Sequence, residues 1–271
     1  MADLVTLEIQ DQIADVRLNR PEKMNALSQG MWKAITEAGE QLSDNRELRA
    51  VVLSGNGRCF CAGLDMASMQ QFQDRDQRTS RSISIPIAGP DERPGNLAQR
   101  ACLIWKRLPV PVIAALHGVA YGAGAQIALG ADIRIAAPDL RLSIMEIKWG
   151  LIPDVGISQT LRDLVPIDVA KELAFTGRIL DGEQAKALGL VTHVAEDPHA
   201  KAMDLAREIA SKSPDAIRSG KRLFEQSWHA DERTGLELET KLQVELIGSE
   251  NQLEAIRANF DKRAPDFKDV G

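Results

Sequence analysis

Two short turns built from small residues constrain this chain more than any other feature. The first is CFCAGLD at Cys59–Asp65, which follows the apolar run Ala50–Leu53, and the second is HGVAYGAGAQIALGA at His117–Ala131, which follows Val112–Leu116. Small residues let a substrate approach the backbone, so that an N–H group can point into a site. Ala123–Leu129 is typical of a helix start, where free N–H groups and the helix dipole stabilise negative charge. The turns predict two backbone donors that converge on one oxygen, an oxyanion hole.

The glycine-rich turn does not match two common phosphate-binding patterns. Ile127 stands where a dinucleotide-binding motif needs its third glycine, and no Gly-Lys-Ser/Thr follows as in a P-loop. Tight packing of a turn against a helix is the alternative interpretation, and spacing alone favours it.

Length and composition limit the class of protein. The 271 residues allow one large domain or a domain with an appendage, and 44% hydrophobic with 27% charged residues is ordinary for a soluble globular protein. The net charge of −6 is spread along the chain without a basic stripe, which argues against nucleic-acid binding. No apolar run is long enough to span a bilayer, so we expect no membrane partner.

The termini and cysteines bear on location and metal binding. The N-terminal MADLVTLEIQDQ has neither a basic start nor an apolar signal region, and three cysteines fit a reducing compartment. We therefore expect a cytoplasmic protein. The cysteines lack zinc-site spacing, so we expect no metal.

Strand-like runs alternate with helical patterns, which predicts an α/β fold with a largely buried sheet. The expected strands are Val5–Ile9, Ile13–Leu18, Arg49–Ser54, Val112–Leu116, Ile133–Ala136, Leu140–Ile144 and Val191–Val194. Ser28 should cap a helix that buries Met31, Ile35, Ala38 and Leu42. The later helices are expected at Asp168–Phe175, Asp181–Leu188, Pro198–Ser211, Pro214–Gln226, Thr234–Ile247 and Gln252–Asp261. Gln70–Asn96, between the expected strands at 49–54 and 112–116, is either a solvated insertion or a mobile cover over the site.

Five motifs, in order, resemble the crotonase superfamily, the enoyl-CoA hydratase/isomerase family. They are NRPEKMNAL at 19–27, CAGLD at 61–65, the HGVAYGAG turn at 117–124, MEIKWGLIPDVG at 145–156 and FTGRILDGEQAKALGLV at 175–191. The resemblance implies a crotonase-like spiral of repeated ββα units at 1–197. It also implies a helical C-terminal region at 198–271 that builds homo-oligomers, as trimers or dimers of trimers.

The resemblance implies an acyl-CoA thioester substrate, a place in fatty acid metabolism and no separate cofactor. It carries the two oxyanion-hole N–H groups onto Leu64 and Ala123. The residues implied for coenzyme A binding are Lys23, Asn25, Ala26, Leu27, Ala62 and Asp65, with Phe260 and Lys262 supplied by a neighbouring subunit.

The acid–base residues decide the reaction that follows thioester polarisation. Hydratases of this family use two glutamates, and this chain retains one, Glu146, while Gln126 stands at the other position. A carboxamide can hold water or substrate but cannot take a proton near neutral pH. Asp154 is the third candidate, with a helix N-cap for 156–164 as its alternative role.

Four functions remain open from the sequence. One carboxylate suits a proton shuttle between C2 and C4, so double-bond isomerisation with Glu146 is favoured. The alternatives are hydration with Gln126 holding water, hydrolysis or dehalogenation with Asp154, and acyl-CoA binding without turnover. His117 at the glycine turn is interpreted as structural, and no Ser/His/Asp order indicates a triad.

Overall fold

The computed structural model describes residues 3–65 and 94–270, and its centre is a six-stranded sheet in the order β1-β2-β3-β4-β6-β8. The first pair is antiparallel and the other pairs are parallel. The strands of this sheet are β1 (Val5–Gln10), β2 (Ile13–Leu18), β3 (Ala50–Gly55), β4 (Val112–Leu116), β6 (Ile133–Ala136) and β8 (His193–Val194). A second, two-stranded parallel sheet joins β5 (Val119–Tyr121) to β7 (Arg141–Ser143).

Helices cover both faces of the large sheet. Those of the body are α1 (Gln29–Ser43), α4 (Leu97–Arg107), α5 (Ala123–Leu129), α6 (Ile157–Thr160), α7 (Ile167–Thr176), α8 (Gly182–Ala187) and α9 (Pro198–Ala210). Three more helices follow: α10 (Pro214–Ser227), α11 (Glu232–Leu246) and α12 (Glu250–Asp261). No helix among the described residues is long and apolar enough to cross a membrane.

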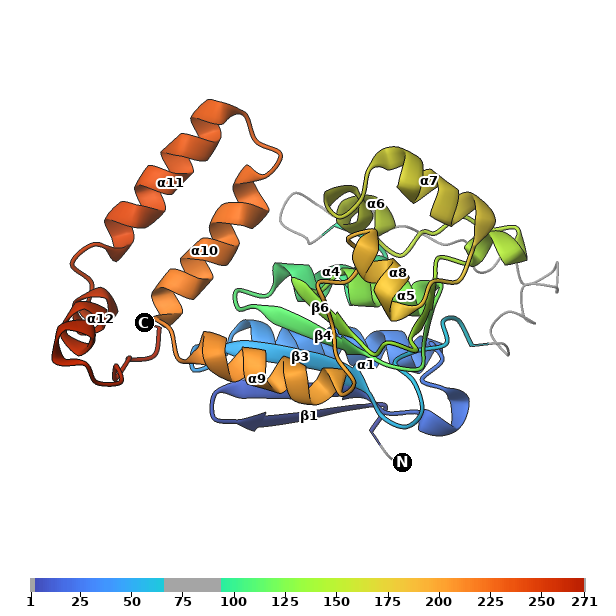
Figure 1. The fold of residues 1–271 in the computed structure, drawn as a ribbon, viewed down its shortest axis with the longest axis horizontal. Coiled ribbons are helices and arrows are strands. Elements are labelled where there is room, and N and C mark those ends of the chain that lie inside the picture. The colour runs from blue at the N-terminus through green and yellow to red at the C-terminus, as the bar shows by residue number, and fades with distance from the viewer. Residues whose placement is uncertain (1–2, 66–93, 271) are drawn as a thin grey trace.

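Strict alternation along the central strands explains the layers. On β3, Val51 and Leu53 point into the larger core with α1 and α4, while Ala50 and Val52 point into the smaller core with α9. Because successive side chains of a strand face opposite sides, one apolar run serves both cores. α9 thus lies across the sheet (Figure 1).

Most of the predicted elements are present, with shifts of a residue or two at their ends. Ser28 caps α1 by accepting from the Met31 N–H, and all four of the apolar positions expected on that helix are buried. The short strand β5 and the helix α4 were not predicted, because β5 lies inside the glycine-rich turn and α4 directly follows the polar segment. The expected cover at 70–96 falls largely on residues outside the described part of the chain.

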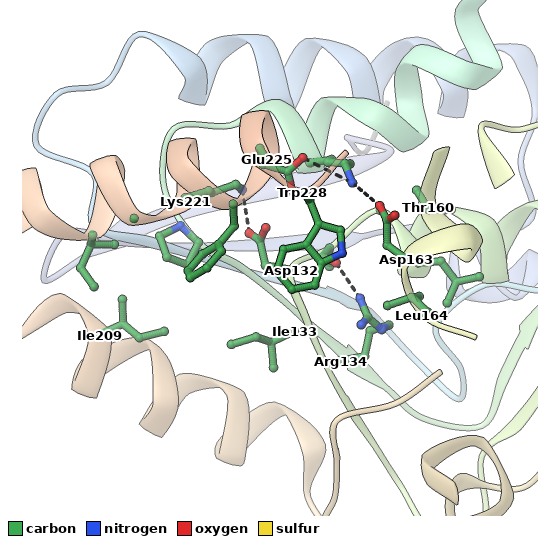
Figure 2. Close-up of a pocket in the computed structure, with 18 of the residues that line it drawn as sticks. Asp132, Ile133, Arg134, Thr160, Asp163, Leu164, Ile209, Lys221, Glu225 and Trp228 are labelled. Carbon is green, nitrogen blue, oxygen red and sulfur yellow. Dashed lines mark hydrogen bonds and ion pairs between the residues drawn. The ribbon is translucent and has the colours of Figure 1, made fainter. Parts of the chain in front are cut away.

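The helices α10, α11 and α12 form an arm that extends from the body (Figure 1). Lys221 fixes α10 to the body. It is 8% exposed at its side chain, donates to the Trp105 and Val110 carbonyl oxygens, and pairs with Asp132 at 2.6 Å. A cavity of about 610 Å³ lies beside this ion pair, with Trp228 and Ile133 among its walls (Figure 2). The division at residue 197/198 into core and C-terminal region stays a prediction.

We expect Lys221→Met to lower the free energy of unfolding by about 2 kcal/mol, because Asp132 and two carbonyl groups lose a charged donor. The measurement is urea denaturation. Lys241→Met on α11 is the matched control, since Lys241 is exposed. Equal effects of the two substitutions would show that Lys221 does not anchor the arm.

Candidate active site

The two small-residue turns of the sequence lie against each other. Cys61 pairs with Ala120 of β5 in a parallel bridge, and the Tyr121 N–H donates to the Cys61 carbonyl at 3.0 Å. Gly63 and Gly124 make the contact possible. A Cβ on Gly63 would lie 2.7 Å from the Tyr121 carbonyl oxygen, and one on Gly124 would lie 2.7 Å from the Cys61 carbonyl oxygen. Such distances are too short for a side chain, so the turns need glycine here.

This arrangement leaves the N–H groups of Leu64 and Ala123 without a hydrogen-bond acceptor among the described residues. Leu64 forms a parallel bridge with Leu27, but the bonds of that bridge use the Leu27 and Asp65 N–H groups. Ala123 is the first residue of α5, where the N–H has no partner within the helix. Neither N–H donates to any residue that the structure describes. The expected donors are therefore free, and their role as an oxyanion hole stays a prediction.

Glu146 reaches the second turn through the small sheet. β7 pairs with β5, and Glu146 begins a 3-10 turn (Glu146–Trp149) shortly after β7 ends. A Cβ on Gly122 would lie 3.2 Å from Glu146 Oε1, so the carboxyl group lies against the glycine that precedes Ala123. The other oxygen, Oε2, is buried and accepts no hydrogen bond within the described part of the chain.

Burial raises the pKa of the Glu146 carboxyl, since the ionised form loses hydration. A hydrogen bond from Gln126 opposes that shift, and the nearby negative charge of Asp154 adds to it. Glu146 is half-buried, and an acid with a buried, unpartnered oxygen and a perturbed pKa is typical of a functional site.

Gln126 is fully buried and contacts Glu146 directly. Its Nε2 donates to Glu146 Oε1 at 2.5 Å, and its Oε1 accepts from the Val155 N–H at 2.8 Å. Both ends of the carboxamide that was expected to hold water thus have a protein partner, and its role toward water stays a prediction. Sequence reasoning missed Val155, because its contribution is a backbone N–H that no side-chain pattern reveals.

Asp154 lies near Glu146 but not in the same environment. It is exposed, and its main-chain carbonyl accepts from Gln99 Nε2 at 3.3 Å. The alternative role as a helix cap is wrong. Gly156 is the N-cap of α6, and no side chain caps that helix.

The first motif forms a tightly bonded loop beside these turns. Asn25 is buried, and its Nδ2 donates to the carbonyl oxygens of Asn56, Cys59 and Phe60. Its side chain therefore braces the loop, and a contact of Asn25 with coenzyme A stays a prediction. Lys23 is exposed, and Ala26 and Leu27 are buried. Ala62 donates its N–H to the Met24 carbonyl.

Asp65 is also held within the protein. It is 8% exposed and pairs with Arg20 at 2.5 Å. Arg20 belongs to the first motif and Asp65 to the second, so this ion pair joins the two. Opposite charges in two neighbouring motifs were a signal that sequence reasoning did not use.

Phe260 and Lys262 are not brought to this site within one chain. They lie at the end of α12, on the far side of the arm from α5 (Figure 1). Phe260 is 84% exposed. A contribution to a neighbouring subunit stays a prediction.

The histidines and cysteines have other partners. The His117 ring contacts the Gly57 carbonyl at 3.0 Å, as expected of a structural residue, while His199 and His229 pair with aspartates. Burial raises the pKa of Cys61 to about 12, which makes a nucleophilic role unfavourable. Among the described residues, no three His, Cys, Asp or Glu side chains are placed to hold a metal ion.

Comparison with known proteins agrees with the turns and with the fold. The family model for enoyl-CoA hydratase/isomerase matches residues 8–270. The chain belongs to this family. It is 33% identical over 258 residues to mitochondrial methylglutaconyl-CoA hydratase of Mus musculus, which covers 93% of this chain and 78% of that protein. It is 32% identical over 255 residues to enoyl-CoA hydratase EchA19 of Mycobacterium tuberculosis, with 93% and 92% covered.

A solved structure of the family shows the same fold. The crystal structure of an enoyl-CoA hydratase from Bacillus anthracis matches with a TM-score of 0.86 and 29% identity, over 98% of this chain and 99% of that one. The crotonase-like α/β fold with a helical C-terminal region is thereby confirmed. Membership of the enoyl-CoA hydratase/isomerase family implies an acyl-CoA thioester as the class of substrate.

For this family member we expect Gly122→Ala to lower the free energy of unfolding by about 1–2 kcal/mol. Gly122 has φ 52° and ψ −122°, and the added Cβ would also press on Glu146. Gly220→Ala is the matched control. It lies in α10 with nothing within 4 Å of the added Cβ, so it should stabilise by about 0.5–1 kcal/mol. Thermal or urea unfolding measures both, and a stable Gly122→Ala would contradict the constraint.

Proposed function

We propose that this enzyme hydrates 2-enoyl-CoA thioesters, with Glu146 as its acid–base group. The observation that carries the proposal is the buried, unpartnered Oε2 of Glu146 beside the turn that presents the Ala123 N–H. The relatives support hydration over isomerisation, because methylglutaconyl-CoA hydratase and enoyl-CoA hydratase are among them. The sequence-based preference for isomerisation is not confirmed by these relatives.

The proposed chemistry uses one carboxyl group twice. The N–H groups of Leu64 and Ala123 donate to the thioester oxygen and stabilise negative charge there, which makes C3 of the conjugated acyl group electrophilic. Ionised Glu146 takes a proton from water as the water oxygen bonds to C3. The protonated Glu146 then gives that proton to C2, and the carbonyl forms again. Water is added across the double bond, and Glu146 returns to its ionised form.

The same site supports the remaining assignments. We propose that the backbone near Ala62 and the exposed Lys23 face the coenzyme A part of the substrate, with no separate cofactor. Asn25 and Asp65 would act by holding that loop, through their bonds to the protein. Hydrolysis through Asp154 is less well supported, since its exposed carboxyl group lacks the buried setting of Glu146.

Product analysis tests the reaction directly. A panel of 2-enoyl- and 3-enoyl-CoA thioesters is incubated with the enzyme in water enriched in heavy oxygen, followed by mass spectrometry. We expect a product that has gained one labelled water. An unchanged mass with a moved double bond would establish isomerisation instead, and free coenzyme A would establish hydrolysis.

We expect Glu146→Gln to lower turnover by ~10²–10⁴-fold and to leave acyl-CoA binding nearly unchanged, because the proposed oxyanion donors are backbone groups. The measurements are steady-state rates and the Kd of a saturated acyl-CoA. Glu172→Gln is the control, since Glu172 is an exposed residue of α7 that pairs with Arg178. Full activity of Glu146→Gln would make Asp154 the leading base.

We further propose a homo-oligomer, a trimer or a dimer of trimers, built through the arm. Large apolar side chains exposed on the arm support this; they are Phe224, Trp228, Leu236, Val244, Ile247, Leu253, Ile256 and Phe260. Soluble proteins rarely leave so many such groups in contact with water. Light scattering at micromolar concentration should give three or six times the chain mass of 29.7 kDa. A stable monomer would contradict both the interface and the shared coenzyme A site.

A further inference from the structure

Four hydrogen bonds link Gln126 to the rest of the protein. Besides its side-chain bonds to Glu146 and Val155, its main-chain N–H donates to the Gly122 carbonyl at 3.0 Å, and its main-chain carbonyl accepts from Cys102 Sγ at 3.0 Å. The side chain is fully buried. A long polar side chain with every contact made inside the protein is rigid.

The Val155 N–H decides which way the Gln126 amide points. It needs an acceptor, so the amide oxygen must face Val155 and the NH₂ group must face Glu146. The reverse orientation would set two donors against each other and an amide oxygen against the carboxylate. The backbone of the 150–156 loop thus controls the donor that meets Glu146.

We propose that Gln126 is a positioning residue that fixes the reacting oxygen of Glu146. It occupies Oε1 and leaves Oε2 as the oxygen that takes and returns the proton. Gln126 lies three residues after Ala123, within the same short helix. One helix turn therefore sets both a proposed oxyanion donor and the orientation of the acid–base group. The proposal rests on the proposed function only in taking Glu146 as that group.

The hydrogen bond from Gln126 Nε2 to Glu146 Oε1 is called the clamp below, and the charges around Glu146 give it a measurable signature. α5 carries no titratable side chain. Helix α7, which packs against the Glu146 turn, carries Asp168, Lys171 and Glu172, and Arg178 follows it. Lys148 belongs to the Glu146 turn itself, and its Nζ lies 5.3 Å from the Trp149 ring centre. Among these and Asp154, Asp154 is the charge that raises the Glu146 pKa, while the Gln126 hydrogen bond lowers it. Removing either contact should move the pKa, in opposite directions.

Carbon-13 NMR titration of glutamate carboxyl groups, assigned with Glu146→Gln, measures this pKa in the substrate-free enzyme. We expect Gln126→Met to raise it, because the ionised form loses its donor. Asp154→Asn should lower it, because a repelling charge is gone. Gln159→Met is the matched control, since Gln159 is exposed and its side chain bonds only to Ser158 among the described residues. It should leave the pKa unchanged.

Kinetics supply the second measurement. For Gln126→Met we expect kcat to fall on the order of 10²-fold through misplacement of the carboxyl group. The Kd of a saturated acyl-CoA should stay the same. The acidic limb of the kcat–pH profile should move to higher pH, because Glu146 must be ionised to act. In Asp154→Asn that limb should move to lower pH.

Specific results would overturn the clamp. A folded Gln126→Met with the wild-type Glu146 pKa and kcat would do so, as would a loss confined to substrate binding. If Gln126→Met does not fold, Gln126→Glu keeps the size, and the two carboxyl groups should share one proton, so that one titrates above its ordinary range. Two ordinary pKa values would then reject the clamp. If Glu146→Gln is fully active while the NMR shifts appear, the proposed function fails: Gln126 then orients the Glu146 carboxyl group, but that group does not carry the reacting oxygen.

Discussion

The contact between the turns at 59–65 and 117–124 is the constraint on which the site depends. Gly63 and Gly124 let two backbones approach so closely that a side chain at either position would collide with a carbonyl oxygen. This approach leaves two N–H groups, on Leu64 and Ala123, that no bridge or helix within residues 3–65 and 94–270 uses. The sheet, the first-motif loop and the Arg20–Asp65 ion pair all serve to hold these turns together.

Glu146 shows how such a framework sets chemistry. Burial alone works against ionisation of the carboxyl group, and a neighbouring negative charge on Asp154 works in the same direction. The hydrogen bond from Gln126 offsets part of this cost by stabilising the ionised form. Hydratases of this family use two glutamates. This chain has one of them, Glu146, and the side-chain amide of Gln126 holds it. The amide cannot exchange protons but can orient the group that does.

The sequence predicts the framework well and the site only in part. Alternation along Ala50–Leu53 and the spacing of apolar residues in α1 suffice to place the sheet and its covering helix, because burial patterns are local. The motifs then locate Leu64, Ala123 and Glu146. They do not reveal that Asn25 braces a loop or that Val155 orients Gln126, since those roles depend on backbone groups brought together by folding. The cap expected from Asp154 was wrong because the chain turns at Gly156 instead.

A crystal structure of the enzyme with a bound 3-hydroxyacyl-CoA would show whether the two turns and Glu146 form one site. We expect the thioester oxygen to accept hydrogen bonds from the Leu64 and Ala123 N–H groups, within about 3 Å of each nitrogen. We also expect Glu146 Oε2 to face C2 and C3 while Oε1 stays on Gln126. A thioester oxygen bound away from these N–H groups, or a Glu146 carboxyl group turned from the acyl chain, would exclude this arrangement.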